Sequence, residues 1–208
     1  RIIIIIVCTT VGFLTIPVFH LLRTYFKEDS VIRFTPEGYT DDASGLNLTK
    51  VHSIIQVPSH KDDIVLQLRN ILEYAEKNNK RVSIAGAKHS MGGHTIYPDG
   101  ILLNMRPYNS MSLDTVNNIL TIGSGALWSD ALQYLNKYDR SVSVMQAFSS
   151  FSIGGSISVN GHGWQHNAPP VSSTIVSFSI MKADGQVLEC DRLNNEELFS
   201  LAIGGYGL

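Results

Sequence analysis

One segment constrains the fold of this chain more than any other, the stretch RVSIAGAKHSMGG at residues 81–93. It begins with a short apolar run at 82–85, which predicts a β-strand, and continues into a turn that holds three glycines. Glycine adopts backbone angles that other residues avoid, so successive amides in such a turn can converge on an anion such as a phosphate. His89 and Ser90 lie inside the turn. Taken alone, the segment is compatible with an anion-binding loop or with an ordinary surface turn.

The residues on either side of this segment predict a β-α-β unit. Residues 51–57 have the apolar content of a strand, and Ser59 is placed to cap a helix that runs to about Asn78 with apolar residues at helical spacing. That helix leads into the strand at 82–85, and a right-handed crossover is expected between the two strands. Further along, the pattern predicts strands at 101–105 and 119–123, a helix at 127–138 and an extended stretch at 142–144.

The second half of the chain predicts antiparallel structure. Residues 175–181 alternate apolar and polar side chains, 183–185 suit a tight turn, and 187–190 complete a hairpin. A last helix is expected at 196–203, with an asparagine just before it as its cap. The predicted fold class is therefore α+β, with a small β-α-β subdomain, a mainly antiparallel sheet with helices, and one hydrophobic helix before them.

The N-terminal segment carries no charged residue from Ile2 to Leu22, close to the ~20 residues that a helix needs to cross a bilayer. It is longer than the apolar core of a usual cleaved signal peptide, and no small-residue cleavage site follows it. We therefore expect a single-pass membrane anchor at 1–23 with its orientation open, a polar linker at 24–50, and a folded domain at 51–208. A cleaved signal, which would leave the protein secreted or periplasmic, and a buried core helix remain as alternatives.

Charge and cysteine content exclude several classes of protein. The 208-residue chain has a formal net charge of −2 and no basic run, so nucleic acid is not an expected partner. Its two cysteines, Cys8 and Cys190, lie far apart, and Cys8 falls in the apolar N-terminus. Neither a disulfide framework nor a cysteine metal site is therefore expected.

Three glycine clusters set this chain apart from an ordinary α+β domain. The first is the turn after 82–85, the second is 152–163 and the third is 204–207. None has the spacing of a dinucleotide fingerprint that opens a helix, and none is a Walker A loop. Glycine where a backbone must approach a ligand closely is the functional interpretation, and tight turns in an antiparallel sheet are the structural one.

Histidines raise the question of a metal site, and four lie in or near the clusters: His89, His94, His162 and His166. His162 and His166 are spaced to share a face of a helix, which is a spacing that suits a metal. The glycines and prolines around them disfavour a helix, and no carboxylate motif accompanies them. No metal site is therefore predicted.

Five elements follow one another in a specific order, at residues 81–93, 101–105, 153–163, 183–190 and 198–207. This arrangement resembles the FAD-binding domain of the vanillyl-alcohol oxidase / p-cresol methylhydroxylase (PCMH) superfamily, whose members include sugar-lactone oxidases, alditol oxidases and cytokinin dehydrogenases. The resemblance covers 51–208. Superfamily members carry a substrate domain after the FAD domain, so the resemblance implies that this chain ends before one.

The resemblance implies that the chain binds FAD. The glycine loop at 86–93 would wrap the pyrophosphate with its backbone amides, and Ser90 would donate to a phosphate oxygen. His89 matches a histidine that many members bond to the 8α-methyl carbon of the flavin, so covalent FAD is expected. The residues implied to bind the cofactor are Gly86, Ala87, Lys88, His89, Ser90, Met91, Gly92, Gly93, Ile153, Gly154, Gly155, Ser158, Asn160, Gly161, Val187, Gly204, Gly205 and Gly207.

Two residues bear on the reaction itself. Gly161 falls where lactone-oxidising relatives hold a small residue that governs oxygen access, and a glycine there would leave the path open and favour an oxidase. His162 is a candidate for lining the flavin pocket. No residue of the sequence is assigned as the catalytic base.

The expected function is an FAD-dependent oxidoreductase, most simply an oxidase. It would transfer a hydride from an alcohol-type carbon of a small alcohol or sugar-type substrate to flavin N5, with oxygen as the expected acceptor. Two alternatives stay open: a flavin-binding module without turnover of its own, and a metal hydrolase that uses the four histidines.

Overall fold

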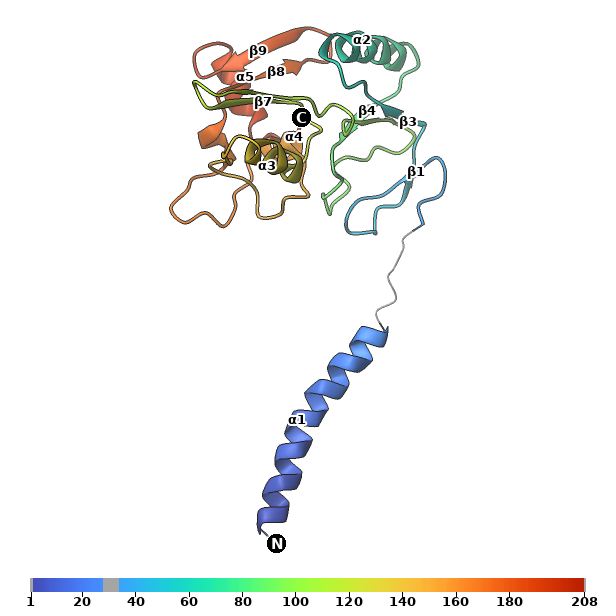
Figure 1. Cartoon of the computed structure of the whole chain (residues 1–208). Helices are drawn as coiled ribbons and strands as arrows, with labels where there is room; N and C mark the ends of the chain where they lie inside the picture. Colours follow the sequence, from blue (N-terminus) through green and yellow to red (C-terminus); the bar gives the residue numbers. More distant parts are fainter. Residues whose placement is uncertain (1, 28–33, 208) are drawn as a thin grey trace. The chain divides into compact units, whose positions relative to one another are not determined.

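A computed structural model of the chain describes residues 2–27 and 34–207. It divides into two compact units, Arg1–Phe34 and Thr35–Leu208, and each is described here by itself. Among its described residues, the first unit contains one helix, α1 (Ile2–Lys27; Figure 1), with Pro17 inside it. A helix is therefore present where a hydrophobic one was predicted.

The transmembrane helix predicted at 1–23 is not found. In the part of the chain that the structure describes, no helix is both long enough and apolar enough to cross a membrane. In the second half of α1, Thr15, Pro17 and His20 interrupt the apolar sequence.

A three-stranded parallel sheet forms the first part of the second unit. Its strands are β3 (Ser53–Gln56), β4 (Val82–Ala85) and β5 (Ile101–Asn104), in the order β3-β5-β4. Both outer strands pair with β5 in parallel. This confirms the predicted β-α-β unit, and β5 lies between the two strands that the helix connects.

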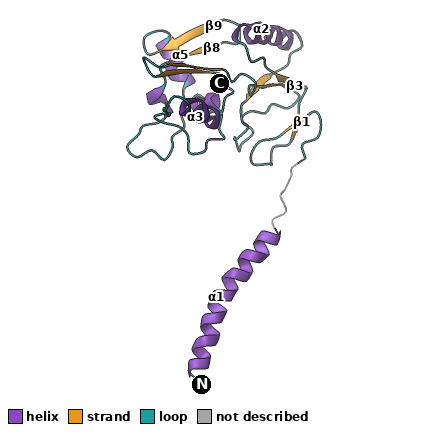
Figure 2. Ribbon diagram, viewed as in Figure 1, coloured by secondary structure: helices purple, strands orange, loops and turns teal. Residues whose placement is uncertain are grey.

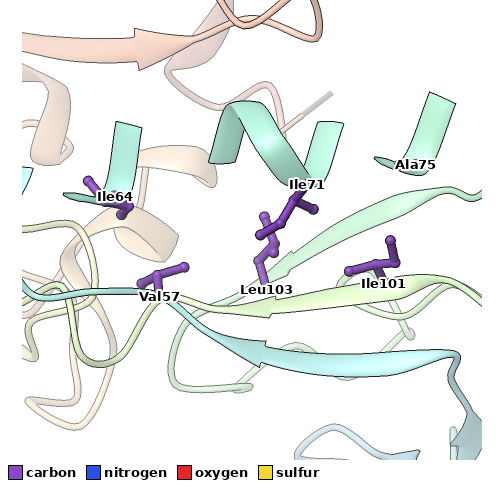
Figure 3. Close-up of a cluster of buried hydrophobic side chains, with 6 residues drawn as sticks. All are labelled: Val57, Ile64, Ile71, Ala75, Ile101 and Leu103. Atoms are coloured by element: carbon purple, nitrogen blue, oxygen red, sulfur yellow. The ribbon is translucent and has the colours of Figure 1, made fainter. Parts of the chain in front are cut away.

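The helix α2 (Lys61–Lys77) covers one face of this sheet. Its inward residues pack on the strands and on the segment that follows β3, as Figure 3 shows, in a cluster of Val57, Ile64, Ile71, Ala75, Ile101 and Leu103. The helix begins one residue later than predicted, because His60 and not Ser59 is the N-cap, and no side chain caps it. Val82 at the start of β4 packs against this core, and Ala85 at the end of the strand, where the glycine loop starts, is buried.

Antiparallel hairpins make up most of the remaining strands. They are β6 (Met111–Asp114) with β7 (Ile119–Ile122), and β8 (Ser177–Met181) with β9 (Val187–Asp191). The second hairpin confirms the sequence prediction, whereas β6 was not predicted. In the described residues the hairpins remain separate two-stranded sheets, not one antiparallel sheet. The helices α3 (Trp128–Asn136) and α5 (Glu196–Ala202) lie where helices were expected.

Two stretches differ from their predictions. The second glycine cluster contains a short helix, α4 (Ile153–Ser158), where no helix was predicted. Residues 142–144 form no strand, and Val144 instead packs in a second core with Ala126, Trp128, Ile153 and Val171. A 3-10 turn, η1 (Val171–Thr174), precedes β8. Figure 2 shows that long loops connect these elements.

Residues 35–50 belong to the second compact unit and are not a free linker. They form a small antiparallel pair, β1 (Tyr39–Thr40) with β2 (Thr49–Lys50). Thr40 and Asp42 are buried in this segment. The predicted linker therefore shortens at its C-terminal end, and its residues 28–33 lie outside the described part of the chain.

Candidate functional site

The first glycine loop, residues 86–93, leaves the carboxyl end of β4 and packs on the residue that precedes α4. A Cβ atom at Gly86 would lie 2.1 Å from Ser152 Oγ, so only glycine allows this approach. The Ala87 amide donates to the same Ser152 Oγ at 3.4 Å. Ser152 thereby joins the first glycine cluster to the second.

The third glycine cluster packs on the other end of α4. The Gly204 amide donates to Ile157 O at 3.1 Å, and the Tyr206 amide donates to Ser158 O at 2.8 Å. The ring of Tyr206 lies 5.7 Å from the ring of His94, which follows the first loop. The three clusters that the sequence singled out are therefore brought together around α4.

The glycines of α4 serve this packing. Gly154 donates its amide to Ser124 O at 2.9 Å, and a Cβ atom there would lie 2.9 Å from Ser124 Cβ. A Cβ atom at Gly155 would lie 2.9 Å from Ser152 Oγ. Side chains of Ser124 and Ser152 therefore lie where a Cβ atom of Gly154 or Gly155 would be. From the sequence, these two glycines were expected to allow close approach of a ligand.

The backbone amides of the first loop are its main unused donors. Within the described residues, no amide from 88 to 92 donates a hydrogen bond to another protein group. Lys88 has a positive φ of 56°, the left-handed conformation that lets neighbouring amides face a common point. The Ser90 hydroxyl is buried in the same loop and has no hydrogen-bond partner among the described residues. Buried polar groups are nearly always hydrogen-bonded in native proteins. The loop therefore has amide donors for an anion and a buried Ser90 hydroxyl that lacks a hydrogen-bond partner among the described residues.

The Lys88 side chain bonds to the N-terminal segment of the unit and not to the glycine loop. Its ammonium donates to Thr40 Oγ1 at 2.8 Å, in the N-terminal segment. Burial lowers the pKa of Lys88, and the Asp41 carboxylate opposes this shift. The loop therefore offers an anion its backbone amides and the Ser90 hydroxyl, in agreement with a cradle that needs no lysine.

His89 is exposed at the surface of this loop. Its ring meets the ring of Phe151 edge to face, with centroids 4.4 Å apart and an interplanar angle of 66°. Phe151 in turn contacts Phe148 in the same manner at 5.7 Å. The His89 ring is therefore exposed on one side and in contact with Phe151 on the other.

Gly161 is buried beside the side chain of Gln146. A Cβ atom at position 161 would lie 2.6 Å from Gln146 Cγ. Gln146 Oε1 accepts a hydrogen bond from Ser156 Oγ, which accepts one from Trp128 Nε1 at 2.8 Å. The expected open path is therefore not seen on this side of Gly161, because Gln146 occupies the space.

The histidines do not gather into one site. His162 and His166 are exposed in the loop after α4, and the described residues contain no group of three or more His, Cys, Asp or Glu side chains able to hold a metal ion. His89 and His94 face different aromatic partners. Nothing in the described structure favours the metal-hydrolase alternative.

The remaining predicted residues are less closely tied to the loop. Met91 is exposed, and Gly207 has open space where a Cβ would lie. Gly205 lies against Leu201 O. Asn160, with a positive φ, lies beside Gly204 and accepts a hydrogen bond from the Ser172 amide. Val187 pairs with Met181 in the β8–β9 hairpin, outside these contacts.

Sequence reasoning missed three residues that the structure adds: Asp42, Ser152 and Gln146. Asp42 accepts the Gly93 amide at 2.7 Å, so this amide is used within the protein. The signal for Asp42 was its neighbour Ser44, since Asp-x-Ser is a common hydrogen-bonded turn. Nothing in the sequence marks Ser152 or Gln146, because their partners are distant in the chain.

A protein-family model matches most of the compact unit that contains the glycine loops. Residues 54–191 match a protein-family model described as "FAD binding domain". The match covers the sheet, α4 and both hairpins, and it includes all but the third of the glycine clusters.

Curated relatives cover a similar part of the chain. L-gulonolactone oxidase of Scyliorhinus torazame is 31% identical over 150 residues, which are 69% of this chain and 33% of that protein. The mouse L-gulonolactone oxidase is 29% identical over 137 residues, 65% of this chain and 31% of that protein. Cytokinin dehydrogenase 2 of Arabidopsis thaliana is 28% identical over 154 residues, 72% of this chain and 30% of that protein. The chain spans about a third of the length of these relatives.

A solved structure shares the fold. 6-hydroxy-D-nicotine oxidase from Arthrobacter nicotinovorans superposes with a TM-score of 0.63 and 23% identity, over 67% of this chain and 31% of that one. The α+β fold predicted from the sequence is thereby confirmed. With the family model covering most of the compact unit from Thr35 onward, this chain belongs to the family of PCMH-type FAD-binding domains.

Proposed function

We propose that this chain is the FAD-binding part of an oxidoreductase that oxidises an alcohol-type carbon. The observation that carries the proposal is the first glycine loop, where five successive amides at 88–92 and the buried Ser90 hydroxyl have no protein partner among the described residues. When bound, FAD supplies a flavin ring that accepts a hydride at N5 and passes the electrons to an acceptor.

The residues present fit the pyrophosphate of FAD. A pyrophosphate offers several anionic oxygens, and amides around a left-handed residue form a concave set of donors suited to them. The Ser90 hydroxyl adds a charge-assisted hydrogen bond, which is stronger than a neutral one. The loop is held from β4 on one side and from Ser152 on the other, so its donors are positioned before a ligand arrives.

His89 is proposed to tether the flavin. Support comes from its exposure in the cradle loop and from its contact with Phe151, which limits the orientations of the ring. An imidazole nitrogen of His89 would hold the flavin through its 8α-carbon, in place of one C–H bond of the methyl group. The two electrons and two protons released would pass to oxygen, the proposed acceptor.

Ser90→Ala should weaken FAD binding. Loss of a hydrogen bond to a charged group costs about 1.5–3 kcal/mol, or roughly 10- to 150-fold in the dissociation constant. Ser83→Ala is the matched control, because Ser83 carries the other buried hydroxyl without a partner but lies within β4. Both substitutions are made in the His89→Ala background, in which FAD binds reversibly, and titration with FAD followed by flavin fluorescence measures the two dissociation constants. Equal affinities for Ser90→Ala and Ser83→Ala would contradict the cradle.

Oxygen is proposed as the acceptor, on the support of two relatives named oxidases. Gly161→Ala should disturb Gln146, since its new Cβ would lie 2.6 Å from Gln146 Cγ. FAD affinity should fall in Gly161→Ala and recover in the double variant Gly161→Ala/Gln146→Ala, which removes the clash. The rate of flavin reoxidation by oxygen, measured by stopped flow, then separates the effect of the clash with Gln146 from the effect of residue size at position 161. A slow reaction with oxygen that persists in the double variant indicates control by size at position 161, whereas affinity that stays low there contradicts the packing account.

The donor is proposed to be a small polyol or sugar lactone, because relatives are named for L-gulonolactone. A panel of such donors should reduce the bound flavin under anaerobic conditions and produce hydrogen peroxide in air. The assay uses the full-length gene product. Flavin that binds but is reduced by no donor would indicate the alternative, a flavin-binding module without turnover.

A further inference from the structure

A segment outside the matched family domain holds the glycine loop in place. The family match begins at residue 54, whereas the segment in question runs from Thr40 to Asn47. At its centre is Asp42, whose side chain is nearly inaccessible, with 7% of the residue exposed. A buried carboxylate needs several donors, so its partners show what it fastens.

Three residues of this segment, Thr40, Asp42 and Ala43, form hydrogen bonds with the loop. Asp42 Oδ2 accepts the Gly93 amide at 2.7 Å. The Ala43 amide donates to Lys88 O at 3.0 Å and to Ser90 O at 3.1 Å. The Lys88 ammonium donates to Thr40 Oγ1 at 2.8 Å. These bonds engage the middle and the end of the loop while leaving its amides at 88–92 unused.

Asp42 is itself held within its own segment. Its Oδ1 accepts the Ser44 hydroxyl at 2.6 Å and the Ser44 amide at 3.0 Å, and its Oδ2 accepts Asn47 Nδ2 at 3.0 Å. Burial raises the pKa of Asp42, but the hydrogen bonds from Ser44, Gly93 and Asn47 outweigh it and lower the pKa to about 2. Asp42 is therefore a carboxylate at any pH above 3.8, and its stabilising contribution is lost only as the pH falls from 3.8 toward 2.

We propose that residues 40–47 form a latch, the Asp42 latch, which holds the FAD-phosphate loop in its binding shape, and that Asp42 is a positioning residue. The inference rests on the proposed function of the loop. Gly93 has a positive φ of 72°, a conformation that the bond to Asp42 fixes. The carbonyls of Lys88 and Ser90 are turned toward Ala43, which leaves the amides between them free to face the phosphates.

The latch also changes the assignment of Gly93. Its amide is bound to Asp42 and is unavailable to a phosphate, so Gly93 anchors the loop. The phosphate donors are then the backbone amides of residues 88–92 and the Ser90 hydroxyl. Asp42 receives four hydrogen bonds, which stabilise its charge within the protein.

The test compares Asp42→Asn with Asp114→Asn. Asp114 is the matched control, since its carboxylate also accepts two amides and one asparagine side chain, from Val116 and Asn117, but in the β6–β7 turn. Asp42→Asn keeps the size of the side chain and removes an acceptor. Two quantities are measured: amide hydrogen exchange of the unliganded protein, and the dissociation constants of FAD and of ADP, which shares the pyrophosphate.

Asp42→Asn is expected to speed exchange of the Gly93 and Ala43 amides, which are hydrogen-bonded between the segment and the loop. It should also weaken both FAD and ADP at least about tenfold, as for loss of a hydrogen bond to a charged group. Asp114→Asn should change neither. Unchanged exchange of the Ala43 amide, or faster exchange with unchanged affinities, would overturn the latch. Faster exchange over the whole unit would indicate a general loss of stability and would also overturn it. Failure of the unsubstituted protein to bind FAD or ADP would instead overturn the proposed function, while the exchange data would still test the latch.

Discussion

His89→Ala is expected to abolish acid-stable flavin altogether. A covalent bond survives denaturation, whereas flavin held by hydrogen bonds is released, so the variant should lose all protein-bound flavin after acid precipitation. His89 is the histidine of the cradle loop itself, and its ring is exposed and oriented by Phe151. Fluorescence of the denatured protein on a gel measures the bond directly. The variant should still bind FAD before denaturation, because the amides at 88–92 remain.

His94→Ala is the matched control for this experiment. His94 is also exposed and follows the same loop, but it lies against Tyr206. It should retain acid-stable flavin at the level of the unsubstituted protein. Acid-stable flavin in His89→Ala would assign the tether to another residue, and its absence from the unsubstituted protein would show that FAD binds without a bond.

Gly86→Ala is expected to reduce FAD affinity by roughly 5- to 150-fold. Gly86 is not among the residues with positive φ, so its backbone tolerates alanine and the effect comes from contact alone. The new Cβ would lie 2.1 Å from Ser152 Oγ and 2.9 Å from Ser152 Cβ. Overpacking of this kind costs about 1–3 kcal/mol and must move either the loop or the start of α4. FAD titration and the thermal unfolding midpoint measure the two consequences.

The double variant Gly86→Ala/Ser152→Gly tests the cause. Glycine at position 152 removes both atoms that the new Cβ would meet, so FAD affinity should recover substantially. Ser152→Gly alone is the control for loss of the bond to the Ala87 amide. Gly86→Ala with unchanged affinity would mean that the loop does not need its contact with Ser152.

The elements that could be predicted from the sequence are those with a strong local pattern. The strand β4 has the predicted bounds, because its apolar residues are followed at once by glycine. The α2 helix shows apolar residues at regular spacing and misses its predicted start by a small shift at His60. The β8–β9 hairpin follows from alternation and a tight turn.

The errors arise where distant contacts override local preference. Glycine disfavours helix, yet α4 forms because Ser124 and Ser152 pack on its glycines. Residues 35–50 have the polar composition of a linker, yet their side-chain hydrogen bonds bury Asp42 against the glycine loop. The position of the loop could be predicted, but its contacts with Asp42 and Ser152 could not, because both contacts join residues far apart in the chain.

A crystal structure of this protein with FAD tests the central claim most directly. We expect the pyrophosphate to lie at the first glycine loop, with its oxygens bonded to amides of residues 88–92 and to Ser90 Oγ, and with the Gly93 amide still bonded to Asp42. A pyrophosphate bound elsewhere, with the Ser90 hydroxyl still without a partner, would contradict the account.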